Sequence, residues 1–348
     1  MGVFDAKHFN SEVFGKYLET VPRVKQNAFL NAGLLNVRNE LKNMLAEQSG
    51  GNYITVPMVG LIGGDELNYD GSTDITATNL DTYLQNMIVY GRAKAWTERD
   101  FSFDITGKDF MAEIAKQVVN YWDDRQQATM LAILKGIFAG THAVATNHTL
   151  DISGETTNNV CGATTLNDVI QKAAGANKNI FKLVIMHSQV ATNLENLQLL
   201  EYAKGADANG IEKDVTLATW NGRTVMIDDD VPAEAVAESA SGKNDGYTKY
   251  TTYVLGTNAF DYCDIGAKVP NEPWRDPKKN GGEDYLITRQ RKLIMPRGFS
   301  FVQPSTPLVS PTNANFEAAA RWKLVTSSVD GTVIDHKAIP IAQIISRG

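Results

Sequence analysis

The sequence predicts an α+β protein, and three observations support this fold class. Apolar residues recur at three- and four-residue spacing over residues 107–139, which is typical of one long amphipathic helix. Residues 165–265 alternate helix-like and strand-like patterns, which is typical of an α/β unit. Residues 52–91 hold two strand-like segments separated by turn residues, which indicates a long two-stranded excursion.

The first 50 residues are predicted to be largely helical. Apolar side chains between Val24 and Leu45 recur at helical spacing, and Ser49-Gly50-Gly51 ends the pattern. Such a helix could pack on the core of its own chain or reach a neighbouring subunit, and the pattern leaves both possibilities open.

The two-stranded excursion begins with Tyr53–Val59 and returns with Gln85–Arg92. Pro57 lacks a backbone N–H, which favours an edge strand. Two strands alone are marginally stable in water, so we expect the ribbon to lie on another part of the structure.

The long helix is predicted to begin at Thr106-Gly107-Lys108-Asp109 and to end at Gly140. Its residues would span roughly 50 Å at about 1.5 Å per residue. A compact globule of this chain length is itself only about 50 Å across, so we expect an elongated or flattened molecule.

The rest of the chain alternates short elements. Residues 141–165 and Ala233–Gly246 are predicted loops. Predicted helices are Leu166–Ala174, Val190–Tyr202 and Asn315–Arg321. Predicted strands are Leu183–Met186, Thr224–Ile227, Tyr250–Leu255, Tyr285–Arg289, Lys292–Met295 and Trp322–Thr326, with a turn at Pro296-Arg297-Gly298 and an apolar segment at Ile339–Ile345.

Composition narrows the function. The chain has 348 residues and a net charge of -7, which argues against a wide nucleic-acid-binding surface. Its two cysteines cannot form a disulfide framework or a four-thiolate metal site. We find no signal-peptide pattern and no apolar run of about 18 residues, so we expect synthesis in a cytoplasm and no membrane partner.

The charge is unevenly distributed. Residues 43–91 contain no Lys or Arg but several acidic residues. In residues 275–297, basic residues outnumber acidic ones. We therefore predict a head-to-tail contact between subunits, in which the acidic loop meets a neighbour's basic segment. The candidate interface residues are Asp65, Glu66, Asp70, Asp74, Arg275, Lys278, Lys279, Arg289, Arg291 and Arg297.

Motifs for catalysis and cofactor binding are weak or missing. There is no dinucleotide-binding or phosphate-binding glycine loop and no paired zinc-binding histidine motif. Ser188 follows a buried strand, but it lacks the flanking glycines of a nucleophile elbow and is better interpreted as a helix cap. We predict no catalytic residue, no cofactor and no metal.

Two weaker hypotheses concern ligands. Asp228, Asp229 and Asp230 could bind a divalent cation, although a solvated turn is the simpler interpretation. Trp274 and Arg275 could stack nucleic-acid bases, although a strand with solvated arginines is more common.

Several stretches, in this order and spacing, resemble the major capsid proteins of tailed bacteriophages with the Hong Kong 97-type fold. They are Gly91–Trp96, the long helix with Tyr121-Trp122 and Leu134–Ala139, Asp151–Gly154, Met186–Ser188, Gly222–Asp229 with Pro232, Tyr250–Tyr253, and Gly281–Arg289 with Pro296-Arg297-Gly298. The resemblance covers nearly the whole chain.

The resemblance implies a domain map. Residues 1–50 would be the N-terminal arm and 51–104 the extended β-hairpin loop. Residues 105–164 would belong to the peripheral domain, whose spine helix is 107–139. Residues 165–265 would form the α/β axial domain, and 266–348 would return to the peripheral domain, with the C-terminal segment re-entering the axial domain.

The resemblance also implies partners. Copies would form pentamers and hexamers of an icosahedral virion capsid, assembled in the bacterial host cytoplasm. The shell would enclose double-stranded DNA without sequence-specific binding. A portal protein, a separate scaffolding protein and a decoration protein are the other expected partners. Because residues 43–91 contain no lysine, we do not expect covalent crosslinking from the loop tip.

Two alternatives stay open at this point. An encapsulin-type compartment would use the same fold to enclose cargo enzymes. A metal-dependent α/β enzyme would use Asp228, Asp229 and Asp230.

Overall fold

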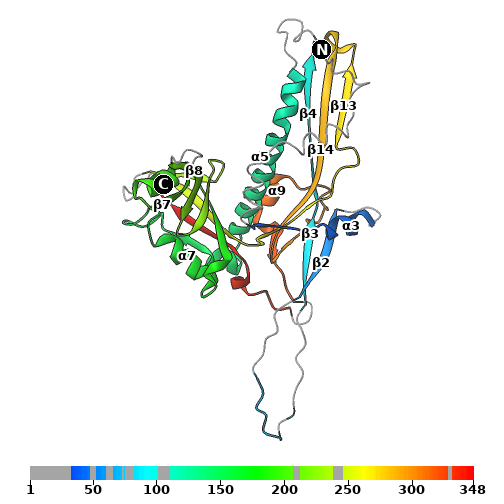
Figure 1. Ribbon diagram of the computed structural model, residues 1–348. Helices are drawn as coiled ribbons and strands as arrows, with labels where there is room; N and C mark the ends of the chain where they lie inside the picture. Colours follow the sequence, from blue (N-terminus) through cyan, green and yellow to red (C-terminus); the bar gives the residue numbers. More distant parts are fainter. Residues whose placement is uncertain are drawn as a thin grey trace.

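Two structural units meet along one long helix in the computed structural model (Figure 1). The structure describes residues 33–47, 52–59, 66–72, 74, 82–100, 110–206, 212–237, 246–327 and 331–348. The helix α5 (Phe110–Phe138) has 29 residues and a length of roughly 43 Å at about 1.5 Å per residue. One unit, here called the α/β lobe, lies beside the C-terminal half of α5, and the other extends along the whole helix.

The α/β lobe is built on an eight-stranded mixed sheet. In spatial order its strands are β5 (Thr149–Asp151), β17 (Ile341–Ser346), β11 (Tyr247–Gly256), β6 (Phe181–Met186), β9 (Arg223–Ile227), β8 (Glu212–Trp220) and β7 (Leu200–Ala206), and β10 (Ala233–Val236) also pairs with β11. The C-terminal strand therefore lies inside this sheet, between β5 and β11.

Both faces of this sheet are covered at its centre, which explains the unbroken apolar run of β6. Val184 and Met186 pack with helices α7 (Thr165–Ala174) and α8 (Ser188–Asn196). Leu183 and Ile185 face the opposite way, toward the core that contains the end of α5. A strand buried on both faces needs apolar residues at successive positions, not alternate ones.

The second unit, here called the elongated lobe, combines α5 with a five-stranded sheet. Its longest strand is β14 (Glu283–Pro296), which pairs with three different strands along its length. These are β4 (Tyr90–Arg99) on one edge and β13 (Asn271–Asp276) followed by β12 (Phe260–Asp264) on the other, while β1 (Leu35–Val37) pairs with β12.

The predicted ribbon is present as β2 (Tyr53–Val59) and β3 (Thr82–Ile88), which form a separate two-stranded sheet, with one further bridge from Tyr83 to Ser327. Alternate residues are buried, and Gln85 donates from Nε2 to the carbonyl oxygens of Pro296 (3.0 Å) and Phe299 (2.9 Å). The ribbon therefore lies on the turn between β14 and β15 (Phe299–Phe301). Two strands alone are marginally stable in water, so this packing supports the ribbon.

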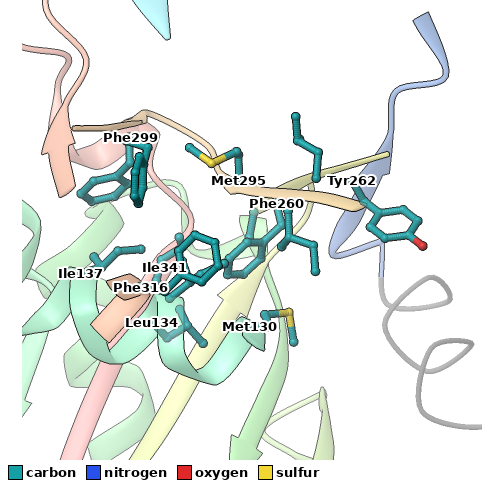
Figure 2. Close-up of a cluster of buried hydrophobic side chains, with 14 of the residues drawn as sticks. Met130, Leu134, Ile137, Phe260, Tyr262, Met295, Phe299, Phe316 and Ile341 are labelled. Carbon is teal, nitrogen blue, oxygen red and sulfur yellow. The ribbon is translucent and has the colours of Figure 1, made fainter. Parts of the chain in front are cut away.

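The main core lies where the two lobes meet (Figure 2). Met130, Leu134 and Ile137 of α5 contact side chains from strands of both sheets, including Phe260, Met295 and Ile341. The remaining short elements around it are α3 (Glu40–Glu47), α6 (Ala143–Asn147), α9 (Asn313–Glu317) and β16 (Trp322–Leu324), with 3₁₀ turns η1 (Lys178–Ile180), η2 (Lys279–Gly281), η3 (Ala319–Arg321) and η4 (His336–Ala338).

The helix predicted over Val24–Leu45 is confirmed only from Glu40 onward and is wrong over the described residues before it. Gly33 has φ +67, residues 35–37 are strand β1, and α3 begins only at Glu40. The strand forms because Leu34 and Leu35 are buried, and Asn36 Nδ2 donates to Asp261 Oδ1 at 2.7 Å. Tertiary pairing outweighs the weak local propensity here. Residues 24–32 lie outside the described residues.

Several other elements differ from the prediction, and the predicted loop over residues 141–165 contains α6 and β5. The helix predicted over Val190–Tyr202 ends at Asn196, because Gln198 adopts φ +54 and the chain then enters β7. Two strands predicted within residues 285–295 are one strand, β14. Part of the predicted loop at Ala233–Gly246 is β10, which extends the sheet by pairing with β11.

Candidate inter-subunit interface

The acidic loop projects away from both sheets. Of the four acidic candidates, Glu66, Asp70 and Asp74 are described and all are exposed, and Asp65 lies outside the described residues. Asp70 Oδ1 accepts hydrogen bonds from the backbone N–H (2.9 Å) and hydroxyl of Ser72, which closes a turn at Gly71 (φ +77). The loop tip, defined as residues 66–72 and 74, lies at the far end of the molecule in Figure 1.

Apolar side chains accompany the acidic groups of the loop tip. Tyr69 is 90% exposed and Leu67 is 46% exposed. Exposed aromatic and aliphatic groups beside charges are typical of a surface that a partner covers.

Half of the basic candidates are neutralised within the chain. Arg275 bridges two carboxylates, with Nη2 2.5 Å from Asp100 Oδ2 and Nη1 2.6 Å from Asp284 Oδ2. Hydrogen bonds to these carboxylates, Asp100 first, raise the pKa of Arg275. Arg289 Nη1 lies 2.8 Å from Glu272 Oε2, and Lys279 Nζ lies 3.4 Å from Glu283 Oε2. These charges are therefore only partly available to a neighbour.

Glu283 organises the end of the elongated lobe. It is buried and accepts hydrogen bonds from Tyr285 and Asn280. These bonds, with that from Lys279, outweigh burial and lower the pKa of Glu283 to about 2. Arg99 Nε also lies 3.2 Å from Glu283 Oε1. Such a network fixes the ends of β4, β13 and β14 against one another.

The other three basic candidates remain exposed. Within the described part of the chain, no ion pair involves Lys278, Arg291 or Arg297. Arg291 lies on the same face of β14 as Arg289, two residues away. These side chains are the ones most available to an acidic partner.

Among the described residues, only one face of the three-stranded part of the elongated lobe is covered by a helix. Leu286 packs on Val118 of α5, and Trp122 Nε1 donates to Thr288 Oγ1 at 3.1 Å. Because side chains alternate along a strand, residues 285, 287, 289 and 291 point away from α5.

The uncovered face combines apolar and basic groups. We define the open sheet face as Trp274, Tyr285, Ile287, Ala93 and Ala95, which lie together by strand register. Trp274 is 55% exposed, and its ring centroid lies 5.5 Å from that of Tyr285. Arg289 and Arg291 continue this face along β14. Sequence reasoning found the basic residues but missed the apolar surface, which depends on pairing three strands distant in sequence.

The turn with Asp228, Asp229 and Asp230, considered above as a weaker candidate for a cation site, serves a structural purpose. Asp229 Oδ1 accepts from the Ser188 backbone N–H at 3.2 Å, and hydrogen bonds from Ser188 lower the pKa of Asp229. Asp228 Oδ1 accepts from the Asp230 N–H at 3.0 Å. No group of three His, Cys, Asp or Glu side chains suited to a metal occurs among the described residues. The turn therefore supports the start of α8.

Two further interpretations from the sequence differ from the structure, one at α8 and one at β13. The N-cap of α8 is His187, whose Nδ1 accepts from the Gln189 N–H at 3.1 Å, so the assignment of Ser188 as the cap is off by one residue. Arg275, suggested to bind nucleic acid with Trp274, is held between two carboxylates. An arginine paired in this way is poorly placed to neutralise phosphate.

Comparisons with known proteins agree with this architecture. The chain is 25% identical over 336 residues to the major capsid protein of Bacillus phage SPP1, covering 97% of this chain and 95% of that protein. No protein-family profile matches the chain. Among the described residues, no helix is long and apolar enough to cross a membrane.

Solved phage capsids have the same fold. The capsid of Ralstonia phage GP4 superposes with a TM-score of 0.55 at 11% identity, covering 91% of this chain and 88% of that one. The cyanophage Pam1 capsid gives 0.53 at 12% identity, covering 100% and 96%. Together with the full-length sequence similarity to a phage coat protein, this fold identifies the chain as a tailed-phage major capsid protein of the Hong Kong 97 type, whose role is structural and not catalytic.

Proposed function

We propose that copies of this chain build an icosahedral shell through head-to-tail contacts, in which the loop tip of one copy lies on the open sheet face of its neighbour. The observation that carries the proposal is the exposure of the loop tip at the far end of the molecule, away from any surface of its own chain (Figure 1). A heterologous contact of this kind closes into rings and shells.

Charge and apolar surface are complementary across the proposed contact. Glu66, Asp70 and Asp74 would approach Arg289 and Arg291, while Tyr69 would cover Trp274. Electrostatics sets the register and speeds encounter, and burial of the apolar groups supplies most of the interface energy.

The domain assignments become part of the same proposal. The α/β lobe, which spans most of residues 165–265 and includes β17, would gather around the five- and six-fold axes. Residues 1–50 and the loop at 51–104 would reach neighbouring copies, and the elongated lobe would form the sides of each pentamer and hexamer.

Contents and further partners follow from the same role. A chain with net charge -7 encloses double-stranded DNA without gripping it, because it offers no excess of cations to the phosphates. We propose assembly in the bacterial cytoplasm with a portal protein, a separate scaffolding protein and a decoration protein. Nuclease-treated particles should contain DNA and co-purify with portal; particles holding cargo enzyme would support the encapsulin-type alternative instead.

Charge reversal of the loop tests the contact directly. The triple variant Asp65→Lys, Glu66→Lys and Asp70→Lys should fold normally, as judged by circular dichroism, but should fail to form shells in electron micrographs and size-exclusion chromatography. A matched control reverses three exposed acidic residues of the α/β lobe, Glu155, Glu201 and Glu234, and changes the net charge equally. Normal shells from the loop variant at physiological salt would refute the electrostatic part of the proposal.

A further inference from the structure

A buried pair of histidines lies at the joint between the two lobes. His148 follows α6, directly before β5, and is 0% exposed. His336 lies in η4, on the segment that leads into β17, and is half-buried. Nε2 of His148 is 3.0 Å from Nδ1 of His336, and the ring centroids are 5.2 Å apart. The pair therefore connects two segments that are 188 residues apart in sequence.

The hydrogen-bond chain fixes where the protons are. Nδ1 of His148 lies 2.7 Å from the carbonyl oxygen of Ile341. A carbonyl only accepts, so Nδ1 of His148 carries a hydrogen and its Nε2, in the neutral ring, is an acceptor. His336 must then donate from Nδ1. While His336 keeps its hydrogen on Nδ1, a second proton on His148 would place two N–H groups against each other at 3.0 Å.

Neighbouring groups oppose a positive charge at this joint. From the start of α6, His142 accepts from the Ala145 N–H through Nδ1, and its buried Nε2 has no hydrogen-bond partner. In η4, His336 opposes a positive charge on His148, and among the described residues Asp335 is the carboxylate that favours it; Lys337 lies in the same 3₁₀ turn.

The adjoining elements add little compensation. On α7, Lys172 Nζ donates to the Thr149 carbonyl at 2.7 Å. On β5, Asp151 is bonded to Ser153, with Lys249 at 3.8 Å. Burial is the main reason why the pKa of His148 falls to about 4, and burial also lowers the pKa of His142.

We propose that the His148–His336 pair is an acid-sensitive latch, which holds the segment 331–340 against α6 while both rings are neutral and releases it when His148 gains a second proton. Protonation removes the acceptor for the hydrogen bond between the rings and places a positive charge on a buried side chain. The effect is local to the segment that leads into β17, because β17 itself is held by pairing with β5 and β11.

Hydrogen exchange of the full-length chain tests the latch. Exchange in the peptide 331–340, corrected for the intrinsic rate, should accelerate roughly 30-fold between about pH 7.5 and about pH 5, since an open state with an ordinary histidine pKa binds the proton that the closed state excludes. The buried β6 peptide (Phe181–Met186) should stay protected over the same range.

Two variants and a control complete the experiment. His336→Ala, on a half-buried side chain, should open the segment already at about pH 7.5 and abolish most of the acid response. His148→Asn, which keeps a donor for the Ile341 carbonyl but does not titrate, should also flatten the response. His187→Asn, at the N-cap of α8, should behave as the unsubstituted chain does.

The proposal is overturned by any of three results. Segment 331–340 and β6 could lose protection together, which would indicate global unfolding. The unsubstituted chain could show no acceleration in acid. His148→Asn could respond to acid as strongly as the unsubstituted chain, which would place the titrating group elsewhere.

Discussion

The sheets of the α/β lobe and the elongated lobe differ in how many of their faces are covered. In the α/β lobe, helices α7 and α8 cover one face of the central strands and the core at the end of α5 covers the other. In the elongated lobe, α5 covers one face of β4, β14 and β13, and the opposite face leaves Trp274 55% exposed. The first unit completes its burial within one chain. The second leaves a surface that, in our proposal, another copy covers.

This difference suggests that one lobe mainly determines the stability of the subunit and the other mainly determines assembly. Substitutions at the centre of the α/β lobe should act on folding, because every apolar contact there is intramolecular. Substitutions on the open sheet face should act on association, because the groups that they remove are already in water in the single chain. The predictions below test this division from the largest expected effect to the smallest.

The largest effect is expected at the centre of the α/β lobe. Phe181→Ala removes a ring that is 1% exposed, and should lower the free energy of unfolding by about 3–5 kcal/mol, the usual range for losing a buried aromatic side chain. Chemical denaturation of the unassembled chain measures it. Loss of less than about 1 kcal/mol would show that the lobe repacks easily and would weaken the contrast with the open sheet face.

The next effect concerns pH at the joint between the lobes. Burial lowers the pKa of His148 to about 4, below its ordinary value of 6.5, so the folded state excludes a proton that the unfolded state binds. The associated stability is present above pH 6.5 and declines as the pH falls toward 4, by up to about 3 kcal/mol. Urea midpoints between these pH values measure the decline. His148→Asn should flatten it, and an unchanged slope in that variant would assign the proton uptake to other groups.

The sequence predicted the α/β lobe better than the elongated lobe, and the reason is physical. Strand β6 and helix α7 carry local patterns, an apolar run and a helical stripe, that need no knowledge of their partners. The prediction divided β14 into two strands and left out Gln290-Arg291. These residues lie on one continuous strand because β4 pairs with them, between the segments of β14 that pair with β13 and β12.

The candidate interface shows the same limit. The distribution of charged residues along the sequence located the acidic loop and the basic segment. It could not show that Arg275 forms an ion pair with Asp100, which is 175 residues away. Nor could it place Ala93 and Ala95 beside Ile287, since that neighbourhood depends on the register between β4 and β14. Local sequence patterns therefore predict which side chains are buried. Which side chains lie together on a surface depends on the pairing of strands that are distant in sequence.

A third prediction compares an exposed apolar residue of the open sheet face with one of the α/β lobe. Trp274→Ala should leave the unfolding free energy nearly unchanged and weaken association by about 2 kcal/mol, the scale of a tryptophan at an interface centre. The concentration at which shells form measures it. Leu197→Ser is the matched control, because Leu197 is 53% exposed on the α/β lobe. Equal defects in both variants would mean that the open sheet face has no special role.

The smallest effect is expected at the ion pairs that end the elongated lobe. Arg275→Lys keeps the positive charge but loses the planar group that reaches Asp100 and Asp284 together. The side chain is 35% exposed, so solvent screens the pairs, and the loss should be only about 0.5 kcal/mol. Hydrogen exchange at the paired ends of β13 and β14 should rise about twofold, and more at low salt than at high salt, because salt already screens these charges. Lys278→Gln, at an exposed lysine without an ion pair in the described part of the chain, should cause no change. A larger loss on Arg275→Lys than on Phe181→Ala would invert the comparison, because it would place the main stability of the subunit in the lobe that we assign to assembly.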